Sequence, residues 1–451
     1  MASRVVCSWG NVICAPHLVY GLRSRHDRFP HLAAPGGTVL PFGNGRSYGD
    51  SCLNVGGALL QTRALDRFIA FDRDTGVLAC EAGVLLADIL RLVVPQGWFL
   101  AAVPGTCYVT VGGAIANDVH GKNHHRAGTF GGHIRRLELL RSNDERLVCS
   151  PTENPQWFAA TVGGLGLTGV ITWAELQLRP IPGPHVSVET IRFANLDEFF
   201  ALAGEAESSA EYTVAWIDCL GRGKHLGRGL LQLAEHVPGG AAGPGGAADS
   251  GVAAGPVAAP GKMSIPLPLP LSLVNALSLR IFNTLYYRRQ LAARKRITQN
   301  FQQFFFPLDG IAHWNRLYGP RGFYQYQCVV PTPTAPDATA KLLETIARSG
   351  LGSFLAVLKH FGSVSSPGML SFPREGVTLA LDFPNKGARV ERLFESLDQI
   401  VGAAGGTLYP AKDGRMPGAL FRSGYPRWQE FSQYIDPACS SSFWRRVLEQ
   451  A

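Results

Sequence analysis

The chain has 451 residues, 46% of them hydrophobic and 17% charged, and a formal net charge of +8 at pH 7. This composition excludes a disordered chain, and the length favours two domains over one. The positive charge suits an anionic partner, but no basic–aromatic stripe or recognised binding module points to nucleic acid. Neither a secretory signal nor a membrane-spanning helix is expected, because no long apolar run occurs.

The cysteines are scattered through the chain and odd in number, and no Cys-x-x-Cys pair occurs. This pattern favours free, mostly buried thiols and argues against a disulfide framework or a zinc ribbon. The nine positions are Cys7, Cys14, Cys52, Cys80, Cys107, Cys149, Cys219, Cys328 and Cys439.

The first part of the chain contains a glycine-rich bend. Residues 1–37 are interpreted as a lead-in segment that ends in a turn, and residues 43–50 (GNGRSYGD) follow a short apolar run. Glycines let successive backbone amides curl into a nest that binds an anion. Strands are expected at 57–62 and 77–82 around a turn at 72–76, and the apolar spacing predicts a helix over 84–94.

A second glycine bend lies in the stretch 104–140, about sixty residues later. Apolar and β-branched residues lead into Gly112-Gly113, and a helix that opens there would offer its first N–H groups to an anion such as a phosphate. Two such bends suit a pyrophosphate held from two sides. The alternative is a glycine-rich loop with a solvated histidine cluster, formed by His120, His124, His125 and His133. Gly121 discourages a helix that would align these histidines on a metal, so no metal site is expected.

Residues 164–169 (GLGLTG) match the dinucleotide fingerprint G-x-G-x-x-G. That fingerprint requires a strand before it and a helix after it. Here the pattern predicts the opposite order, with a helix at 155–160 and an alternating strand at 170–176. A Rossmann-type nicotinamide site is therefore rejected. Another strand–turn–strand unit is expected over 137–149.

The proline-rich break at 180–184 predicts a domain boundary. Beyond it the pattern predicts strands at 186–193, 212–218, 323–330, 354–359 and 377–383, and helices at 196–206, 335–349 and 390–402. The Gly/Ala/Pro tract at 238–261 is expected to be disordered.

An apolar, proline-rich segment at 263–271 precedes a helical pattern at 277–287 and basic residues at 288–289 and 294–296. This combination suits contact with a lipid surface or a lipid phosphate. The alternative is a loop that closes over the core with a solvated helix behind it.

Short segments in a fixed order carry a resemblance to a known family. They include 45–50 (GRSYGD), 109–116 (VTVGGAIA), 118–125 (DVHGKNHH), 161–169, 314–316 (WNR), 325–327 (QYQ), 382–384 (DFP) and 411–413 (AKD). Together they resemble flavoproteins of the vanillyl-alcohol-oxidase type over nearly the whole chain. The chain is most similar to those members that oxidise a polyprenyl-phosphate-linked ribose.

The resemblance implies an α+β fold, with a two-subdomain FAD-binding domain and a cap that carries the substrate on an antiparallel sheet. The expected limits are 1–183 for the FAD-binding domain, 184–405 for the cap with a flexible loop at 238–275, and 406–451 for a return to the first domain. The glycine-rich turn at 164–169 is compatible with a position beside the flavin.

The resemblance also implies a set of flavin contacts. They are Pro41, Phe42, Gly43, Asn44, Gly45, Arg46, Ser47, Tyr48, Gly49, Asp50, Ser51, Gly105, Thr110, Val111, Gly112, Gly113, Asn117, Asp118, Val119, His120, Ile171 and Tyr409. Relatives that bond flavin covalently often have histidine where this chain has Arg46. Because a guanidinium cannot serve as that nucleophile, the expected cofactor is non-covalent FAD.

The activity implied is oxidation of the 2′-hydroxyl of a polyprenylphosphoryl-β-D-ribose to the keto sugar. Catalysis is assigned to Lys412, His120 and Tyr48, since the hydroxyl proton must be drawn off as the hydride leaves. The alternatives are a solvated Lys412 in a turn and a His120 bonded to a loop carbonyl. The expected substrate contacts are Lys122, Trp216, Tyr318, Gln327, Lys359, Ala380 and Lys412. Ala380 and Thr378 depart from the family pattern, so the shape of the pocket can differ.

The resemblance further implies a separate nicotinamide-dependent reductase that completes epimerisation to the arabinose form used in cell-wall polysaccharide. It also implies peripheral contact with the inner membrane, on its cytoplasmic or periplasmic face. The competing expectation is an alditol or sugar-lactone oxidase that passes electrons to oxygen.

Overall fold

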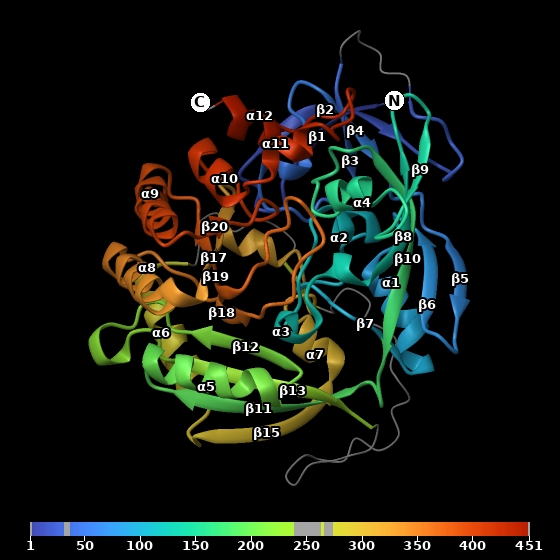
Figure 1. Cartoon of the computed structure of the whole chain (residues 1–451). Coiled ribbons are helices and arrows are strands. Elements are labelled where there is room, and N and C mark those ends of the chain that lie inside the picture. The colour runs from blue at the N-terminus through green and yellow to red at the C-terminus, as the bar shows by residue number, and fades with distance from the viewer. Residues whose placement is uncertain (1, 31–36, 239–262, 266–273, 450–451) are drawn as a thin grey trace.

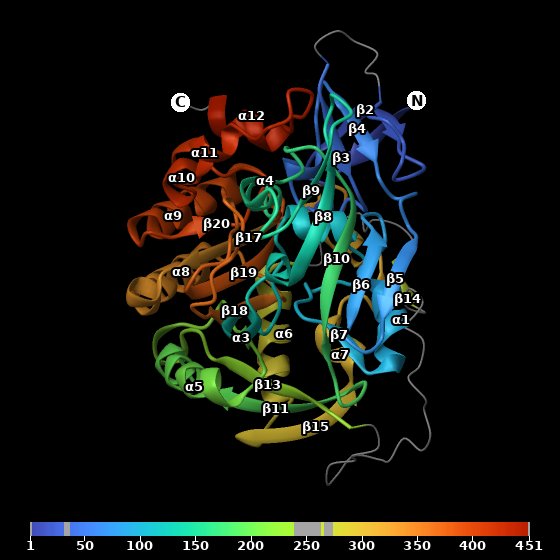
Figure 2. The ribbon, with the colours of Figure 1, turned by 45° about the vertical axis from the view of Figure 1, so that its right-hand side comes forward.

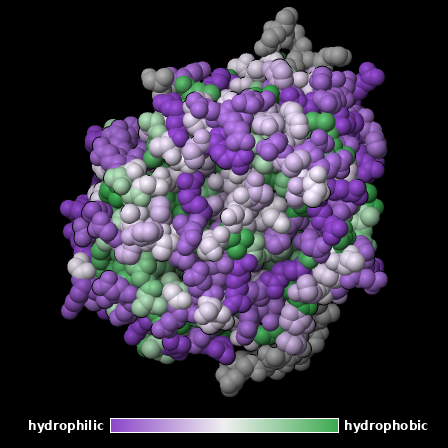
Figure 3. Space-filling view, viewed as in Figure 1, coloured by the Kyte–Doolittle hydropathy of each residue, from purple (hydrophilic) through white to green (hydrophobic). Residues whose placement is uncertain are grey.

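The computed structural model describes residues 2–30, 37–238, 263–265 and 274–449. Figures 1 and 2 show two halves side by side, with the sheets from the first 180 residues in one half and the sheet from the middle of the chain in the other. Most residues on the face in Figure 3 are hydrophilic, and the apolar ones form small patches. The segment 239–262, for which disorder is expected, lies outside the described residues, as does 266–271 of the apolar proline-rich segment.

The first half contains two sheets. One is a four-stranded sheet whose strands, in order, are β1 (Ala2–Cys7), β2 (Cys14–Gly21), β4 (Ala58–Gln61) and β3 (Val39–Phe42). The other is antiparallel and runs β5 (Phe68–Asp72), β6 (Val77–Glu81), β10 (Val170–Pro180), β8 (Ile134–Leu140) and β9 (Arg146–Cys149), with β7 (Trp98–Leu100) also paired to β10. The helices here are α1 (Leu86–Val93), α2 (Val111–Ala116), α3 (His124–Ala127) and α4 (Pro155–Thr161).

The second half is built on one antiparallel sheet of eight strands. Their order is β15 (Arg294–Asn300), β11 (His185–Phe193), β13 (Gly229–Val237), β12 (Tyr212–Ile217), β18 (Ala356–Phe361), β19 (Gly376–Pro384), β17 (Phe323–Val330) and β20 (Thr407–Leu408). Helices α5 (Leu196–Ser209), α8 (Ala335–Ser349) and α9 (Ala388–Ala403) cover its outer face in Figure 1. On the other side lie α6 (Ala276–Arg288), α7 (Phe301–Phe305) and a parallel pair, β14 (Met263–Ser264) and β16 (Ile311–Ala312).

The chain then returns to the first half. Helix α10 (Gly418–Gly424) lies beside α9 and β20, and α11 (Trp428–Ser432) and α12 (Ser442–Glu449) follow it toward the four-stranded sheet in Figures 1 and 2. Val39 of β3 pairs with Cys439, and Arg446 of α12 forms an ion pair with Asp50. The mixed helices and antiparallel sheets confirm the α+β class.

The halves share apolar core. Phe99 of β7 lies against Phe301 and Phe305 of α7, with ring centroids 5.4 and 5.2 Å apart. Aromatic side chains bury large areas, and edge-on ring pairs add to that stabilisation. The same packing that stabilises each half therefore also fixes the position of one half against the other.

The reversed order around the GLGLTG turn is confirmed, because α4 precedes it and β10 follows it. The lead-in interpretation of residues 1–37 was wrong, since β1 and β2 form a hairpin there. Burial alternates in the first half of β2, where Ala15 and His17 are buried and their neighbours are exposed.

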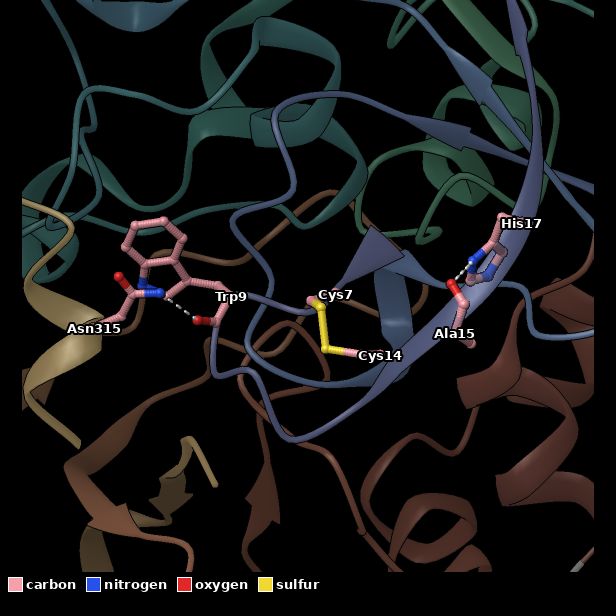
Figure 4. The surroundings of a disulfide bond; sticks show 6 residues. All are labelled: Cys7, Trp9, Cys14, Ala15, His17 and Asn315. Carbon is pink, nitrogen blue, oxygen red and sulfur yellow. Dashed lines mark hydrogen bonds between the residues drawn. A yellow bond between two sulfur atoms is a disulfide. The ribbon is translucent and has the colours of Figure 1, made fainter. Parts of the chain in front are cut away.

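The expectation of free thiols was wrong for two cysteines. Cys7 and Cys14 end the two hairpin strands as direct register partners and form a disulfide (Figure 4). Sequence spacing alone does not reveal that a tight hairpin will place two cysteines opposite each other. The other seven cysteines are free, and all but Cys52 are buried.

Candidate active site

A cavity of about 790 Å³ lies between the two halves. One wall comes from the bends after β3 and before α2, and the opposite wall comes from β17, β18 and β19 of the eight-stranded sheet. Tyr286 of α6 and Trp314 close part of the remaining side. A deep, mostly apolar cavity with a few polar groups is the usual form of a cofactor and substrate site.

The first glycine bend offers backbone donors to this cavity. Within the described residues, none of the five N–H groups of 43–47 donates a hydrogen bond to the protein. Gly45 has φ +58°, a left-handed conformation that glycine adopts without strain. The side-chain oxygen of Ser51, also in the cavity wall, is buried and has no partner in the described structure. Buried donors need an acceptor, and an anionic ligand in this nest would supply one.

The second glycine bend meets the first one. Thr110 caps α2 by accepting a hydrogen bond from Gly113 N at 3.1 Å, so Gly112 and Gly113 form the first turn of that helix. A Cβ on Gly43 would lie 2.4 Å from the Thr110 hydroxyl oxygen. Only glycine at position 43 therefore allows the two bends to approach each other so closely. Both bends line the cavity. The expectation that the start of α2 offers free N–H groups to a phosphate was wrong, because Val111 N donates to Val84 O, Gly112 N donates to Ala82 O and Gly113 N donates to Thr110. The donors left for an anionic ligand are those of 43–47.

The register of the eight-stranded sheet aligns the opposite wall in rows. Gln327 of β17, Ala380 of β19 and Val357 of β18 are direct partners across three strands, and all three line the cavity. Two residues further along β19, Asp382 lies opposite Gln325, whose amide donates to its carboxylate at 2.7 Å. Side chains alternate between the two faces of a sheet. The observed register therefore places the side chains of these paired residues on the face that lines the cavity.

His120 joins the two walls. Its Nε2 lies 3.0 Å from the Gln327 amide nitrogen and its Nδ1 lies 3.2 Å from Lys359 Nζ. Burial, followed by the charge of Lys359, lowers the pKa of His120 well below its usual value, so the ring is neutral. A neutral imidazole has one donating and one accepting nitrogen, and His120 therefore links a lysine on β18 to an amide on β17.

Lys412 is buried in the cavity wall and is not a solvated turn residue. Its Nζ lies 4.0 Å from the centre of the Tyr48 ring. Burial lowers the pKa of Lys412 to about 8, while the nearby Asp382 opposes this effect. Burial also raises the pKa of Asp382 to about 7. The two groups titrate together near neutral pH, as groups that move protons in active sites commonly do.

Two further lysines line the cavity and add positive charge when they are protonated. Burial lowers the pKa of Lys122 to about 7, with a further contribution from Lys359. The Lys122 amine donates to the Phe304 carbonyl and lies 4.0 Å over the ring of that residue. Burial and then the charge of Lys412 lower the pKa of Lys359 to about 7. Such a site favours a substrate or cofactor with negative charge.

Most of the expected residues meet at this cavity. Those that line it are Pro41, Phe42, Gly43, Asn44, Gly45, Arg46, Ser47, Tyr48, Ser51, Gly105, Thr110, Gly112, Gly113, Asn117, Val119, His120, Lys122, Ile171, Trp216, Gln327, Lys359, Ala380, Tyr409 and Lys412.

Five expected residues do not line the cavity, because each is engaged behind its wall. Gly49 packs so closely on Asp413 that a Cβ would lie 1.9 Å from the carbonyl oxygen of that residue. Asp50 pairs with Arg446. Val111 is fully buried in the apolar core. Asp118 accepts from Gly131 N at 2.8 Å, and Tyr318 stacks on Phe323 with ring centroids 4.2 Å apart.

Sequence reasoning missed several cavity residues. Trp9 lies in the hairpin loop closed by the disulfide, stacks under the Arg46 guanidinium at 4.3 Å and accepts a hydrogen bond from Asn315 (Figure 4). Asp382 and Gln325 lie within quoted segments but received no role. The alternation of 325 and 327 on one strand was the signal that could have placed Gln325 beside Gln327. Among the described residues, no three His, Cys, Asp or Glu side chains gather as metal ligands.

Comparison with known proteins gives one matching family and three similar proteins. Residues 31–150 match the FAD binding domain family. Decaprenylphosphoryl-beta-D-ribose oxidase of Mycolicibacterium smegmatis is 37% identical over 406 residues, which cover 88% of this chain and 86% of that protein. An uncharacterized protein in the mprA 5′ region of Streptomyces coelicolor is 34% identical over 358 residues, or 79% of this chain and 96% of that protein. Cytokinin dehydrogenase 8 of Oryza sativa subsp. indica is 30% identical over 185 residues, 39% of this chain and 34% of that enzyme.

Proposed function

The chain belongs to the family of decaprenylphosphoryl-β-D-ribose oxidases, and from that premise we propose that it oxidises the 2′-hydroxyl of a polyprenylphosphoryl-β-D-ribose to the 2′-keto sugar. It is an FAD-dependent oxidoreductase with an FAD-binding domain in its first third. The observation that carries the substrate proposal is the wall of Lys412, Lys359, His120 and Gln327 that faces two glycine bends across one cavity. Three lysines that line the cavity, each positive when protonated, suit a phosphorylated sugar.

The first bend fits the cofactor, because the N–H donors of 43–47 lie in the cavity wall beside Gly112 and Gly113 of α2, which let the two bends approach closely. The non-covalent state is part of the proposal. Arg46 stands where a covalent link would need a nucleophile, and its guanidinium donates to Asn44 O at 2.8 Å. We expect acid denaturation to release all of the yellow colour into the supernatant. Colour that stays with the precipitated protein would contradict this.

When bound, FAD accepts a hydride from the carbinol carbon. The chain's own residues handle the proton. Lys412, with a pKa lowered to about 8 by burial, is partly neutral at physiological pH and can take the hydroxyl proton. The charge of Asp382 acts on Lys412 and favours its protonated form. Burial raises the pKa of Tyr48 well above its usual value, so Tyr48 stays a neutral hydroxyl under the Lys412 amine.

His120, Gln327 and Lys359 would position the sugar. His120 is held on both sides of its ring, and the Gln327 amide also donates to Thr378 at 3.3 Å. A catalytic group held by such a network keeps one orientation and reduces the entropy lost on reaction. Lys122, Trp216 and Ala380 would contact the remainder of the substrate, whereas Tyr318 acts from behind Tyr48 through Phe323.

The decisive experiment is anaerobic mixing of the purified protein with farnesylphosphoryl-ribose while the flavin absorbance is followed. We expect rapid bleaching with this substrate and none with xylitol or a sugar lactone. Bleaching with xylitol or a lactone instead would favour the alternative of an alditol or sugar-lactone oxidase. A flavin that bleaches with none of these compounds would contradict an oxidase role on any of them.

Two further elements complete the proposal. A nicotinamide-dependent reductase subunit would convert the keto sugar to the arabinose form for cell-wall polysaccharide, because the oxidised product must regain a hydride with the opposite stereochemistry. Contact with the inner membrane would be peripheral, through the basic residues at 288–289 and 294–296. Within the described residues, no helix has the length and apolar character needed to cross a membrane.

A further inference from the structure

Helix α6 has an inner face that belongs to the cavity wall. Leu279 and Asn283 are buried, and the Asn283 amide donates to Asp218 at 2.8 Å. Tyr286 packs on Trp216 with ring centroids 4.6 Å apart, and both rings line the cavity. This face is therefore fully used by the fold and by the site.

The outer face of the same helix carries an apolar stripe. Leu277, Ile281 and Leu285 are 69%, 53% and 65% exposed. They are spaced four residues apart, so they follow one another along one side of the helix. Leu291, just after the helix, is also exposed. A lone exposed leucine needs no explanation, but a contiguous stripe marks an interaction surface.

The surroundings of this stripe are positively charged. Residues 274–300 contain six basic side chains and no acidic one. All six are exposed: Arg280, Arg288, Arg289, Arg294, Lys295 and Arg296. Among the described residues, the ion pairs of these six side chains are all with Glu189 on the neighbouring strand β11, 3.8 Å from Arg294 and 3.4 Å from Arg296. The net charge of the surface remains strongly positive.

We propose that the outer face of α6, defined by Leu277, Ile281 and Leu285 and flanked by the basic residues at 288–296, docks on an anionic phospholipid bilayer. An amphipathic helix with apolar residues on one side and cations beside them lies in the membrane interface, where both groups find partners. The inference rests on the proposed function, because it explains how a lipid-linked sugar reaches the cavity. Leu285 points to the bilayer while the next residue, Tyr286, lines the cavity.

A bilayer fits this face better than a second copy of the chain. A twofold contact through α6 would place the two sets of six cations beside each other, and like charges in a desolvated contact are unfavourable. An anionic lipid surface instead supplies negative charge over the whole area, with hydrocarbon beneath it for the three side chains.

The test is flotation of the full-length FAD-loaded protein with vesicles made of equal parts phosphatidylglycerol and phosphatidylcholine. We expect the parent to float with these vesicles, and more weakly with pure phosphatidylcholine or at high salt. The variant Leu277→Glu/Ile281→Glu/Leu285→Glu should bind at least about 100-fold more weakly, because three large side chains no longer enter the apolar layer. The matched control is Val5→Glu, which alters an equally exposed residue on β1 and should float like the parent.

Three outcomes would overturn the inference. They are a parent that does not bind anionic vesicles, a triple variant that floats as well as the parent, and a parent dimer that the triple variant abolishes. Flavin content and melting temperature establish that the variant is folded. Anaerobic bleaching by farnesylphosphoryl-ribose in solution, without vesicles, reports the proposed function separately. A triple variant that bleaches like the parent but no longer floats isolates the docking face from the chemistry.

Discussion

The two walls of the cavity present different kinds of chemical groups to a ligand. The wall from the first half uses main-chain groups, namely the N–H donors of 43–47, which lie beside the glycines of α2. The wall from the eight-stranded sheet uses side chains, with Gln327, Lys359 and Asp382 each on a different strand. The first wall suits a cofactor that any member of a broad family binds, and the second suits one substrate. Changes to the two walls should therefore have separable effects.

The largest effect is expected at Lys412, which the fold brings to the substrate side. Lys412→Ala should lower the rate of flavin bleaching by about 10²–10⁴-fold, the range for loss of a general base, while the flavin stays bound. Stopped-flow absorbance measures the rate, and the bound flavin spectrum reports the cofactor. Lys341→Ala, at an exposed i,i+4 pair with Asp337, is the control. Bleaching at the parental rate would exclude a catalytic role for Lys412.

A substitution behind the first glycine bend should instead weaken the binding of the flavin. In Gly49→Ala the new Cβ would lie 1.9 Å from Asp413 O and 2.5 Å from Gly414 Cα, and neither backbone atom can yield cheaply. Overpacking of this kind costs about 1–3 kcal/mol, so FAD should bind roughly 10- to 100-fold more weakly as the first bend moves.

The measurement is flavin retained after gel filtration, with back-titration of FAD. Gly204→Ala on α5, where a Cβ meets nothing within 4 Å, should keep its flavin and be as stable as the parent or slightly more so. Unchanged FAD affinity in Gly49→Ala would mean that the packing behind the bend does not hold it in place.

The Trp9 loop connects the first glycine bend to the segment that contains Asn315. Trp9 N donates to Ser47 O at 2.9 Å on the cofactor side, and Asn315 donates to Trp9 O at 3.2 Å on the other side. The Cys7–Cys14 disulfide closes this short loop. Its loss in Cys7→Ser/Cys14→Ser should lower the free energy of unfolding by about 2 kcal/mol.

Urea unfolding with and without dithiothreitol measures this difference. Reductant should shift the midpoint of the parent to lower urea and leave that of the double variant unchanged. Equal midpoints for the oxidised parent and the variant would show that the loop is held by its other contacts alone.

The smallest expected effect is a shift in the pH dependence of kcat/KM when Asp382 is replaced. The rate needs neutral Lys412, so kcat/KM should rise with pH through a midpoint near 8, the pKa to which burial lowers this lysine. Asp382 opposes that lowering, and Asp382→Asn should therefore move the midpoint to lower pH, by about one unit. Asp337→Asn, at an exposed site, should leave the profile in place. A midpoint that moves upward would contradict the assigned sign of the coupling.

Much of the wall formed by the first half was predictable, because a glycine indicates a tight bend or a close backbone approach at its own position. The bends at 43–50 and 112–113, the helix 84–94 and the reversed order around 164–169 all follow from local pattern. The same local logic failed for Gly49, Asp50, Val111 and Asp118, which lie in the right segments but face away from the cavity. A segment identifies a bend, whereas the direction of each residue depends on what packs behind it.

The sequence alone therefore determined the two glycine bends and the residue types available for chemistry, since these depend on short-range propensity and on composition. The α+β class was implied by the resemblance to a known family. The tertiary structure decided that Asp382 lies beside Lys412, that Gln327 and Lys359 reach His120 from two strands, and that Cys7 meets Cys14. Strand register and the burial of charges are properties of long-range packing. No local stretch of residues encodes them, and the shifted pKa values of the site exist only after the two halves have closed around it.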